Sequence, residues 1–207
     1  MHGPAVNYGQ MRFRVIDDQV ASRQTLRNSA QNMGAFSVMF SESYADAIFR
    51  IRNNPPSIIL CDYMLGNGRS GQQLLEELRR FDLLPDECVF IMVTAEQSYE
   101  QVASAVELVS DDYILKPFFP DLLQTRLDWA LAKRLFLMPY YRARRAKKFG
   151  EAQTSRHKME RAREGKLYAI DLIRAQAQLY ILMDRGPDAG CRIYLSAHLR
   201  NLQFPEG

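Results

Sequence analysis

The sequence predicts an α/β protein in which a doubly wound, five-stranded parallel sheet precedes a smaller all-α domain. Apolar runs alternate strictly with helix-like patterns through residues 12–134, and such alternation favours right-handed crossovers between parallel strands. The run Ile58 to Cys61 has no polar alternation, which is typical of a strand buried on both faces. The charge changes sign along the chain, because residues 1–134 contain 13 Lys and Arg against 17 Asp and Glu, whereas residues 135–207 contain 14 against 7. We therefore expect two domains with different roles.

The first half of the sheet is predicted from two repeats of a strand and a helix. Residues 1–11 lack periodicity and are expected to form a flexible leader before the first strand over 12–17. A helix over 19–33 follows, because apolar residues recur at helical spacing until a glycine ends the pattern. A short strand over 36–40 and a helix over 43–53 repeat the unit, and an Asn-Asn-Pro-Pro sequence then breaks the helix.

The second half begins with the central strand, whose apolar run ends on Asp62. A glycine-rich loop from Gly66 to Gly71 leads into a helix over 72–81 with its leucines on one face. The remaining predicted elements are a strand over 89–94, a helix over 99–109, a strand over 112–115 and a helix over 120–134.

Composition limits the class of protein. The chain has 207 residues, of which 47% are hydrophobic and 25% charged, as in an ordinary globular protein. The longest apolar stretches are too short to span a bilayer, so we expect a cytoplasmic protein without a membrane partner. The three cysteines, Cys61, Cys88 and Cys191, are widely separated, which indicates neither a disulfide framework nor a zinc site.

Polar residues follow four of the five predicted strands. Because the carboxyl ends of parallel strands meet at one edge of a sheet, where ligands bind, we expect these side chains to form one site. They are Asp17 and Asp18 after the first strand, Asp62 after the third, Thr94 after the fourth and Lys116 after the fifth.

These residue types suit phosphoryl transfer. Three carboxylates repel one another unless a hard divalent cation binds, and an oxygen-only ligand set favours Mg²⁺. Asp62, the central carboxylate, is the expected nucleophile, and Lys116 and Thr94 supply a positive charge and a hydroxyl for phosphoryl oxygens. The alternative is that the acidic pair caps a helix, Lys116 is a surface charge and Asp62 begins a turn. This alternative does not explain why all of these residues fall at the ends of predicted strands.

Residues 12–134 resemble the receiver domain of two-component response regulators, a flavodoxin-like fold. The resemblance is specific because five separated positions match in order. They are Asp17-Asp18, Asp62, Thr94-Ala95, Tyr113 and Lys116-Pro117.

The resemblance implies that Asp62 accepts phosphate from a sensor histidine kinase or a phosphotransfer protein. It implies a Mg²⁺ site and a catalytic role restricted to the domain's own phosphorylation and dephosphorylation. The implied metal ligands are Asp17, Asp18, Asp62 and the backbone carbonyl of Met64; the implied phosphoryl contacts are Thr94, Ala95 and Lys116; the implied switch residues are Thr94 and Tyr113.

Tyr113 allows a plainer interpretation, and Gly66 departs from the family pattern. From its pattern alone Tyr113 is a half-buried strand aromatic. Gly66 stands where many receivers have proline, a departure expected to loosen the loop without touching the chemistry.

Residues 135–207 form the basic output region. Small and aromatic residues at helical spacing resemble tetratricopeptide-type hairpins, at Phe149 and Ala152 and again at Gly190, Tyr194 and Ala197. Two copies are fewer than the three or more that repeat arrays need, so the chain could be a fragment of a longer array. We expect a helical protein-interaction module whose partners are a downstream protein and a second copy of the chain.

The alternative output is a DNA-binding regulator, because basic runs are typical of nucleic-acid binding. Against it, no short glycine turn between two compact helices is apparent. An enzymatic output has least support, since His157 and His198 have no neighbouring carboxylate or cysteine in the sequence arranged as a metal or triad partner.

Overall fold

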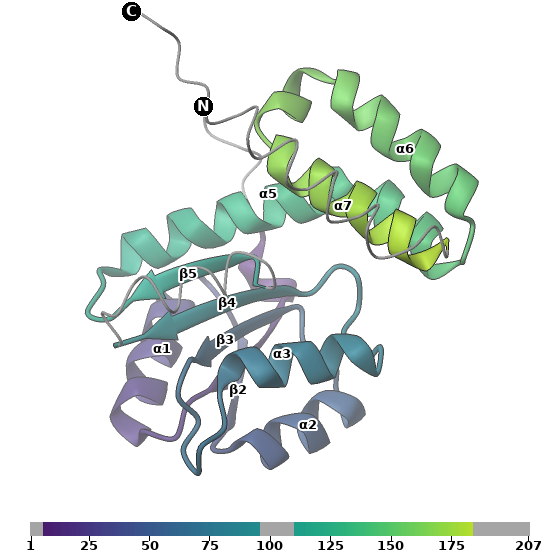
Figure 1. Ribbon diagram of the computed structural model, residues 1–207. Helices are drawn as coiled ribbons and strands as arrows, with labels where there is room; N and C mark the ends of the chain where they lie inside the picture. Colours follow the sequence, from purple (N-terminus) through teal and green to yellow (C-terminus); the bar gives the residue numbers. More distant parts are fainter. Residues whose placement is uncertain (1–5, 96–109, 184–207) are drawn as a thin grey trace, which may run out of the picture. The chain divides into compact units, whose positions relative to one another are not determined.

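The computed structural model describes residues 6–95 and 110–183 (Figure 1). The chain divides into two compact units, Met1–Arg134 and Leu135–Gly207, and each is described by itself. Within the described residues, no helix combines the length and the apolar character that crossing a membrane requires.

The first unit contains one five-stranded sheet in the order β2-β1-β3-β4-β5, with every neighbouring pair parallel. The central strands β3 and β4 are buried at every residue, which explains their unbroken apolar runs. The predicted parallel sheet is confirmed. Its strands are β1 (Arg12–Ile16), β2 (Ser37–Ser41), β3 (Ile58–Asp62), β4 (Val89–Thr94) and β5 (Asp112–Leu115).

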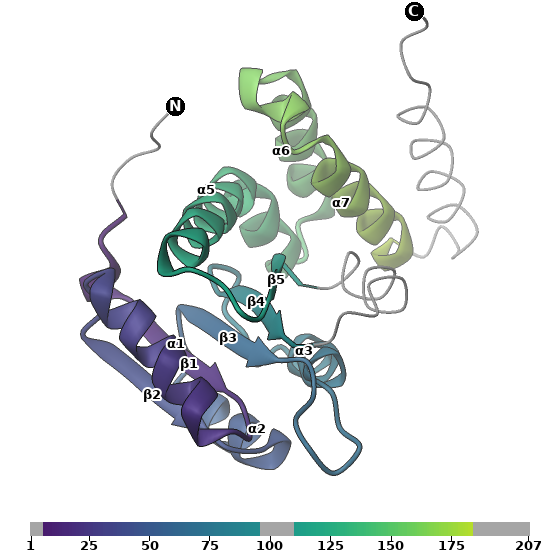
Figure 2. The same ribbon diagram turned by 90° about the vertical axis from the view of Figure 1, so that its left-hand side faces the viewer.

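Helices cover both faces of this sheet (Figures 1 and 2). One apolar cluster joins α1 and α5 to one face, and a second joins α2 and α3 to the other. The predicted helix over 99–109 lies outside the described residues. The described helices of the sheet are α1 (Val20–Asn32), α2 (Tyr44–Asn53), α3 (Gly71–Arg80) and α5 (Pro120–Arg145).

The prediction of a flexible leader through residue 11 is wrong from Tyr8 onward. Residues Tyr8–Gln10 form a short 3₁₀ helix, and the Tyr8 side chain is only 3% exposed. Its ring lies 6.1 Å from that of Phe13, and its hydroxyl donates to Asp128 Oδ1 of α5 at 2.7 Å. A large ring buried with its hydroxyl paired orders this segment, although the segment has no periodicity.

The predicted end of the last sheet helix at Arg134, with a link over Leu135 to Pro139, is also wrong. Helix α5 continues to Arg145 and contains Pro139 in its interior. An internal proline costs about 3 kcal/mol, because it removes one backbone hydrogen bond and crowds the preceding turn. Tyr140 is fully buried beside it and donates its hydroxyl to the Ala175 carbonyl at 2.8 Å. The packing of Tyr140 therefore outweighs the helix-breaking tendency of Pro139.

The second unit is helical in its described part, as predicted. The end of α5 is followed by α6 (Phe149–Arg161), a 3₁₀ turn (Arg163–Lys166) and α7 (Ala169–Leu182). The later hairpin markers Gly190, Tyr194 and Ala197 lie outside the described residues. The buried core of this unit consists of Leu137, Tyr140, Ala143, Ala152, Met159, Leu172, Ala175 and Leu179.

Candidate functional site

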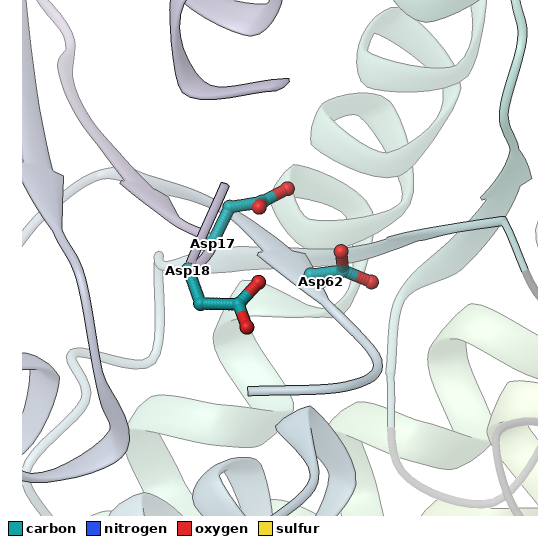
Figure 3. Close-up of side chains that lie close together, drawn as sticks. All are labelled: Asp17, Asp18 and Asp62. Carbon is teal, nitrogen blue, oxygen red and sulfur yellow. The ribbon is translucent and has the colours of Figure 1, made fainter. Parts of the chain in front are cut away.

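Three carboxylates meet at the carboxyl edge of the sheet (Figure 3). Asp17 directly follows β1 and is fully buried, Asp62 ends β3 and is 6% exposed, and Asp18 is exposed. Each offers an oxygen, and these oxygens all lie within 4.8 Å of one another. The parallel pairing of β1 with β3 places the two strand ends side by side, so residues 45 positions apart share one site.

Lys116 directly follows β5, the outermost strand on one side of the sheet, and bridges two of these carboxylates. Its Nζ lies 2.7 Å from Asp17 Oδ2 and 2.9 Å from Asp62 Oδ2. The backbone holds this residue in register, because Lys116 N–H donates to the Thr94 carbonyl at 2.7 Å; the Lys116–Pro117 peptide bond is cis. The structure thus brings Asp17, Asp18, Asp62 and Lys116 together.

Burial and the neighbouring charges shift the pKa values of Asp62 and Lys116 in this cluster. Burial raises the pKa of Asp62, and the charge of Asp17 adds to the rise, whereas the bond from Lys116 opposes it. Burial alone lowers the pKa of Lys116, but its hydrogen bonds to Asp17 and Asp62 raise it on balance. When all four groups are ionised, three negative charges face one positive charge, so the edge attracts a further cation.

The donor set fits a hard divalent cation. Among the described residues, neither the carboxylate of Asp18 nor the Met64 carbonyl has a hydrogen-bond or ion-pair partner, so both oxygens are available as ligands. Within residues 6–95 and 110–183, Asp62 Oδ1 accepts only a long hydrogen bond, from Met64 N–H at 3.4 Å. Carboxylate and carbonyl oxygens with room for water are the surroundings that Mg²⁺ favours.

Asp17 is held in place by residues that sequence reasoning missed. Gln19 N–H donates to its Oδ1 at 2.8 Å and Ser22 Oγ to its Oδ2 at 2.5 Å. The buried Arg23 donates through Nη1 to the Asp17 carbonyl at 2.7 Å and pairs with Glu42 at 3.0 Å. The sequence signal that could have identified them is the presence of polar residues, Ser22 and Arg23, in the first turn of the helix that follows the acidic pair.

The loop after Asp62 folds back on itself like a hairpin. Leu65 N–H donates to the Arg69 carbonyl, and Gly71 N–H donates to the Tyr63 carbonyl at 2.7 Å. Gly66 has a φ of +72°, which proline cannot adopt because its ring fixes φ near −65°. The glycine thus permits a hydrogen-bonded turn at this position, and the expectation that it loosens the loop stays a prediction.

Gly71 lies where the loop enters α3 and is the tightest point beside the site. A Cβ built there would lie 2.4 Å from the Asp62 carbonyl oxygen and 2.9 Å from Cys61 Sγ. Ser70 and Gln73 begin the helix with reciprocal hydrogen bonds, in a capping box. The Ser-x-x-Gln pattern could have indicated this helix start from sequence.

The remaining predicted site residues lie on β4 and β5. Thr94 is buried at the end of β4, opposite Leu115, and Ala95 is exposed directly after it. Tyr113 is half-buried on β5, opposite Met92, and packs against the apolar cluster that includes α3. Their predicted roles toward a phosphoryl group stay predictions.

Replacing Asp18 with alanine is expected to weaken Mg²⁺ binding by about tenfold or more, because a hard cation loses an anionic oxygen ligand. Isothermal titration calorimetry measures this affinity directly. Asp121→Ala removes another exposed carboxylate, from the start of α5, and should leave the affinity unchanged. Equal affinities for the wild type and Asp18→Ala would exclude Asp18 as a ligand.

Comparison with known proteins adds family information to this geometry. Residues 13–128 match the family model described as the response regulator receiver domain. The phosphate regulon transcriptional regulatory protein PhoB of Escherichia coli (strain K12) is 33% identical over 116 residues, covering 56% of this chain and 49% of that protein. PhoB of Pseudomonas aeruginosa is 33% identical over 119 residues, covering 58% and 51%. The chain thus spans about half the length of these relatives.

Solved structures of the same kind are similar in fold. A response regulator receiver domain protein (CheY-like) from Methanospirillum hungatei JF-1 has a TM-score of 0.52 and 24% identity, covering 59% of this chain and 94% of that one. The receiver domain of the Francisella response regulator 1452 also has a TM-score of 0.52, with 25% identity, covering 60% and 98%.

Proposed function

The chain belongs to the response regulator receiver family, and from this premise we propose that it is a phosphorylation-dependent regulator of a two-component system. In this proposal Asp62 accepts a phosphoryl group from a sensor histidine kinase or a phosphotransfer protein. The observation that carries the proposal is the clustering of Asp17, Asp18 and Asp62 with Lys116 bridging two of them at the carboxyl edge of the sheet.

The proposed step is a displacement at phosphorus. A carboxylate oxygen of Asp62 attacks the phosphorus of a phosphohistidine, the P–N bond breaks, and the imidazole leaves with the electron pair. Lys116 Nζ, 2.9 Å from Asp62 Oδ2, stabilises the negative charge on the phosphoryl oxygens, and Thr94 and Ala95 contact the group. Mg²⁺ bound by Asp17, Asp18, Asp62 and the Met64 carbonyl supplies further charge neutralisation.

The chain's catalytic role ends with its own phosphorylation and dephosphorylation in this proposal. Hydrolysis of the acyl phosphate returns Asp62 to its carboxylate. Transfer of ³²P from an autophosphorylated kinase, or from labelled acetyl phosphate, tests the donor side. The label should be found on the peptide that contains Asp62 and should require Mg²⁺.

The output proposed for the second unit is a helical protein-interaction module of tetratricopeptide type. Its support is the packing of α6 against α7, with the small residue Ala152 fully buried between helices. Small residues at such positions let helices approach closely. A downstream protein, and a second copy of this chain, are the proposed partners.

DNA binding is the second candidate output. The relatives named PhoB are called transcriptional regulatory proteins, and the second unit carries many exposed basic residues. A steep fall of DNA affinity with rising salt would favour this candidate, because each phosphate neutralised releases counterions. Protein capture that persists in salt would favour the interaction module. Among the residues of this unit that the structure describes, the exposed basic ones are Arg142, Arg145, Lys147, Lys148, Lys158, Arg161, Arg163 and Lys166.

Control of the output by the site is tested by hydrogen exchange with beryllofluoride, a mimic of the acyl phosphate. The mimic should draw Thr94 toward Asp62 and shift Tyr113, which changes exchange at Tyr113 and beyond Arg134 together. Helix α5 carries residues of both units, so we expect the conformational change at the phosphorylation site to reach the second unit through this helix. A coupling free energy of about 1–3 kcal/mol between Asp62 and the second unit would change the conformational equilibrium of that unit by about 5- to 150-fold.

Thr94→Ala is the matched variant for this experiment. It should reduce the exchange changes at Tyr113 and beyond Arg134 in parallel, while beryllofluoride still binds. If the mimic binds and exchange beyond Arg134 is untouched, the receiver does not control this output through α5.

A further inference from the structure

The loop between β3 and α3 contains Met64, whose backbone carbonyl is one of the expected Mg²⁺ ligands, and the two arms of this loop pair with each other. Met64 and Ser70 form an isolated antiparallel bridge. Leu65 N–H donates to the Arg69 carbonyl at 3.0 Å. Because the arms are joined in this way, a contact that holds the returning arm also holds the arm that carries the Met64 carbonyl.

Each arm of the loop has an anchor on another part of the first unit. Leu65 of the first arm is 3% exposed and belongs to the apolar cluster that includes α2 and α3. Arg69 of the second arm places its guanidinium carbon 5.0 Å from the ring centroid of Tyr44, the first residue of α2. The tip between the arms includes Gly66 and Gly68, both at positive φ, and glycines give a loop many alternative conformations. The contact of Arg69 with Tyr44 is therefore placed to favour one of them.

Tyr44 is itself held by two helices. Its ring is half-buried and packs against the same apolar cluster. Its hydroxyl donates to the Glu77 carboxylate of α3 and lies 3.3 Å from the Gln73 carbonyl oxygen. Burial and the hydrogen bond to Glu77 raise the pKa of Tyr44 to about 12, so the hydroxyl stays protonated and remains a donor at neutral pH. Arg69 thus lies over a ring whose position is fixed.

We propose that Tyr44 and Arg69 are positioning residues for the metal site, and that their contact holds the loop between β3 and α3 in the conformation that presents the Met64 carbonyl to Mg²⁺. A cation is attracted to the face of an aromatic ring, so the contact favours this conformation before any metal binds. The proposal rests on the Mg²⁺ site of the proposed function. Neither residue has to touch the metal or the phosphoryl group.

Calorimetric titration of the full, unphosphorylated chain with Mg²⁺ tests the proposal. Arg69→Gln should weaken Mg²⁺ binding by about two- to fivefold, which corresponds to the loss of one exposed cation–π contact. The sign of the change is informative, because loss of a positive charge from the loop would by itself strengthen the binding of a divalent cation. Unchanged or tighter binding by Arg69→Gln would overturn the proposal.

Three further variants separate the contact from the charge. Arg80→Gln removes an exposed arginine of α3 that lies over the ring of Phe81, and it should leave the affinity unchanged. Tyr44→Leu breaks the contact with Arg69 without removing a positive charge, and it should weaken Mg²⁺ binding at least as much as Arg69→Gln. In the double variant the two losses should not add, because both substitutions remove the same contact. Additive losses, or an equal loss in Arg80→Gln, would contradict the proposal.

Hydrogen exchange of the metal-free chain reports on the loop itself. The Leu65 N–H is bonded to the Arg69 carbonyl, and Arg69→Gln leaves this backbone carbonyl in place. Exchange at Leu65 should nevertheless become about two- to fivefold faster, because the loop opens more often. The amides of β3 should exchange as in the wild type. No change at Leu65, or an equal increase throughout β3, would show that Arg69 does not hold the loop.

Labelling by ³²P-acetyl phosphate separates this proposal from the phosphorylation proposal. Arg69→Gln should need about two- to fivefold more Mg²⁺ for half-maximal labelling but should reach the wild-type rate at saturating Mg²⁺, because bound metal restores the loop conformation. A lower rate at saturating Mg²⁺ would contradict a role confined to the metal site. A wild type that binds Mg²⁺ with the expected effect of Arg69→Gln, but is not labelled, would refute Asp62 as phosphoacceptor and support the positioning role.

Discussion

Asp62→Asn is expected to abolish labelling of the chain by ³²P-acetyl phosphate. The amide oxygen cannot form the acyl phosphate, while the amide has nearly the same shape as the carboxylate. Labelling should fall to background, whereas Asp121→Asn, an exposed change on α5, should label like the wild type. Mg²⁺-dependent labelling of Asp62→Asn at the wild-type level would place the phosphoacceptor elsewhere.

The same variant should be more stable than the wild type at neutral pH without metal. Burial raises the pKa of Asp62 even with Lys116 alongside, so ionising this group costs more free energy in the folded protein than in the unfolded chain. The cost is absent below the ordinary carboxyl pKa of about 3.9 and grows as pH rises through it. Thermal melting should therefore show the advantage of Asp62→Asn at pH 7 and little of it at acid pH.

Gly71→Ala is expected to destabilise the first unit by about 3 kcal/mol or more. The new Cβ would lie 2.4 Å from the Asp62 carbonyl oxygen, and backbone cannot yield as a flexible side chain can. The end of β3 or the start of α3 must therefore move. Urea unfolding followed by the fluorescence of Trp129, the only tryptophan, reports on this unit.

Gly68→Ala is the control for that experiment. Gly68 lies in the same loop at a φ of +70°, and a Cβ there would meet nothing within 4 Å. It should cost only the strain of a left-handed alanine, about 1–2 kcal/mol. A loss for Gly71→Ala no larger than that for Gly68→Ala would show that the loop relaxes freely. Displacement of Asp62 should also slow phosphorylation of Gly71→Ala.

The sheet and its acidic edge followed from local patterns. The runs ending at Asp17, Asp62 and Lys116 identify strands, and parallel pairing alone places their carboxyl ends together. The order β2-β1-β3-β4-β5 is one of several that right-handed crossovers allow, and the structure established it. The inferences about strands and their ends needed no knowledge of side-chain contacts, because the period and the ends of elements are properties of the sequence itself.

Contacts between distant segments were decided only by the tertiary structure. Nothing around Tyr8 in the sequence indicates that its hydroxyl meets Asp128, 120 positions away. Pro139 is locally a helix breaker, but the burial of Tyr140 keeps α5 helical through it.

Arg156 of α6 is buried, and its Nε–H has no acceptor among the described residues; this likewise depends on which side chains surround it once α6 and α7 pack. The sequence determined the elements, the sheet and the acidic residues at its edge. The structure decided which polar groups find partners, because pairing depends on separations of a few ångströms between residues that are remote along the chain.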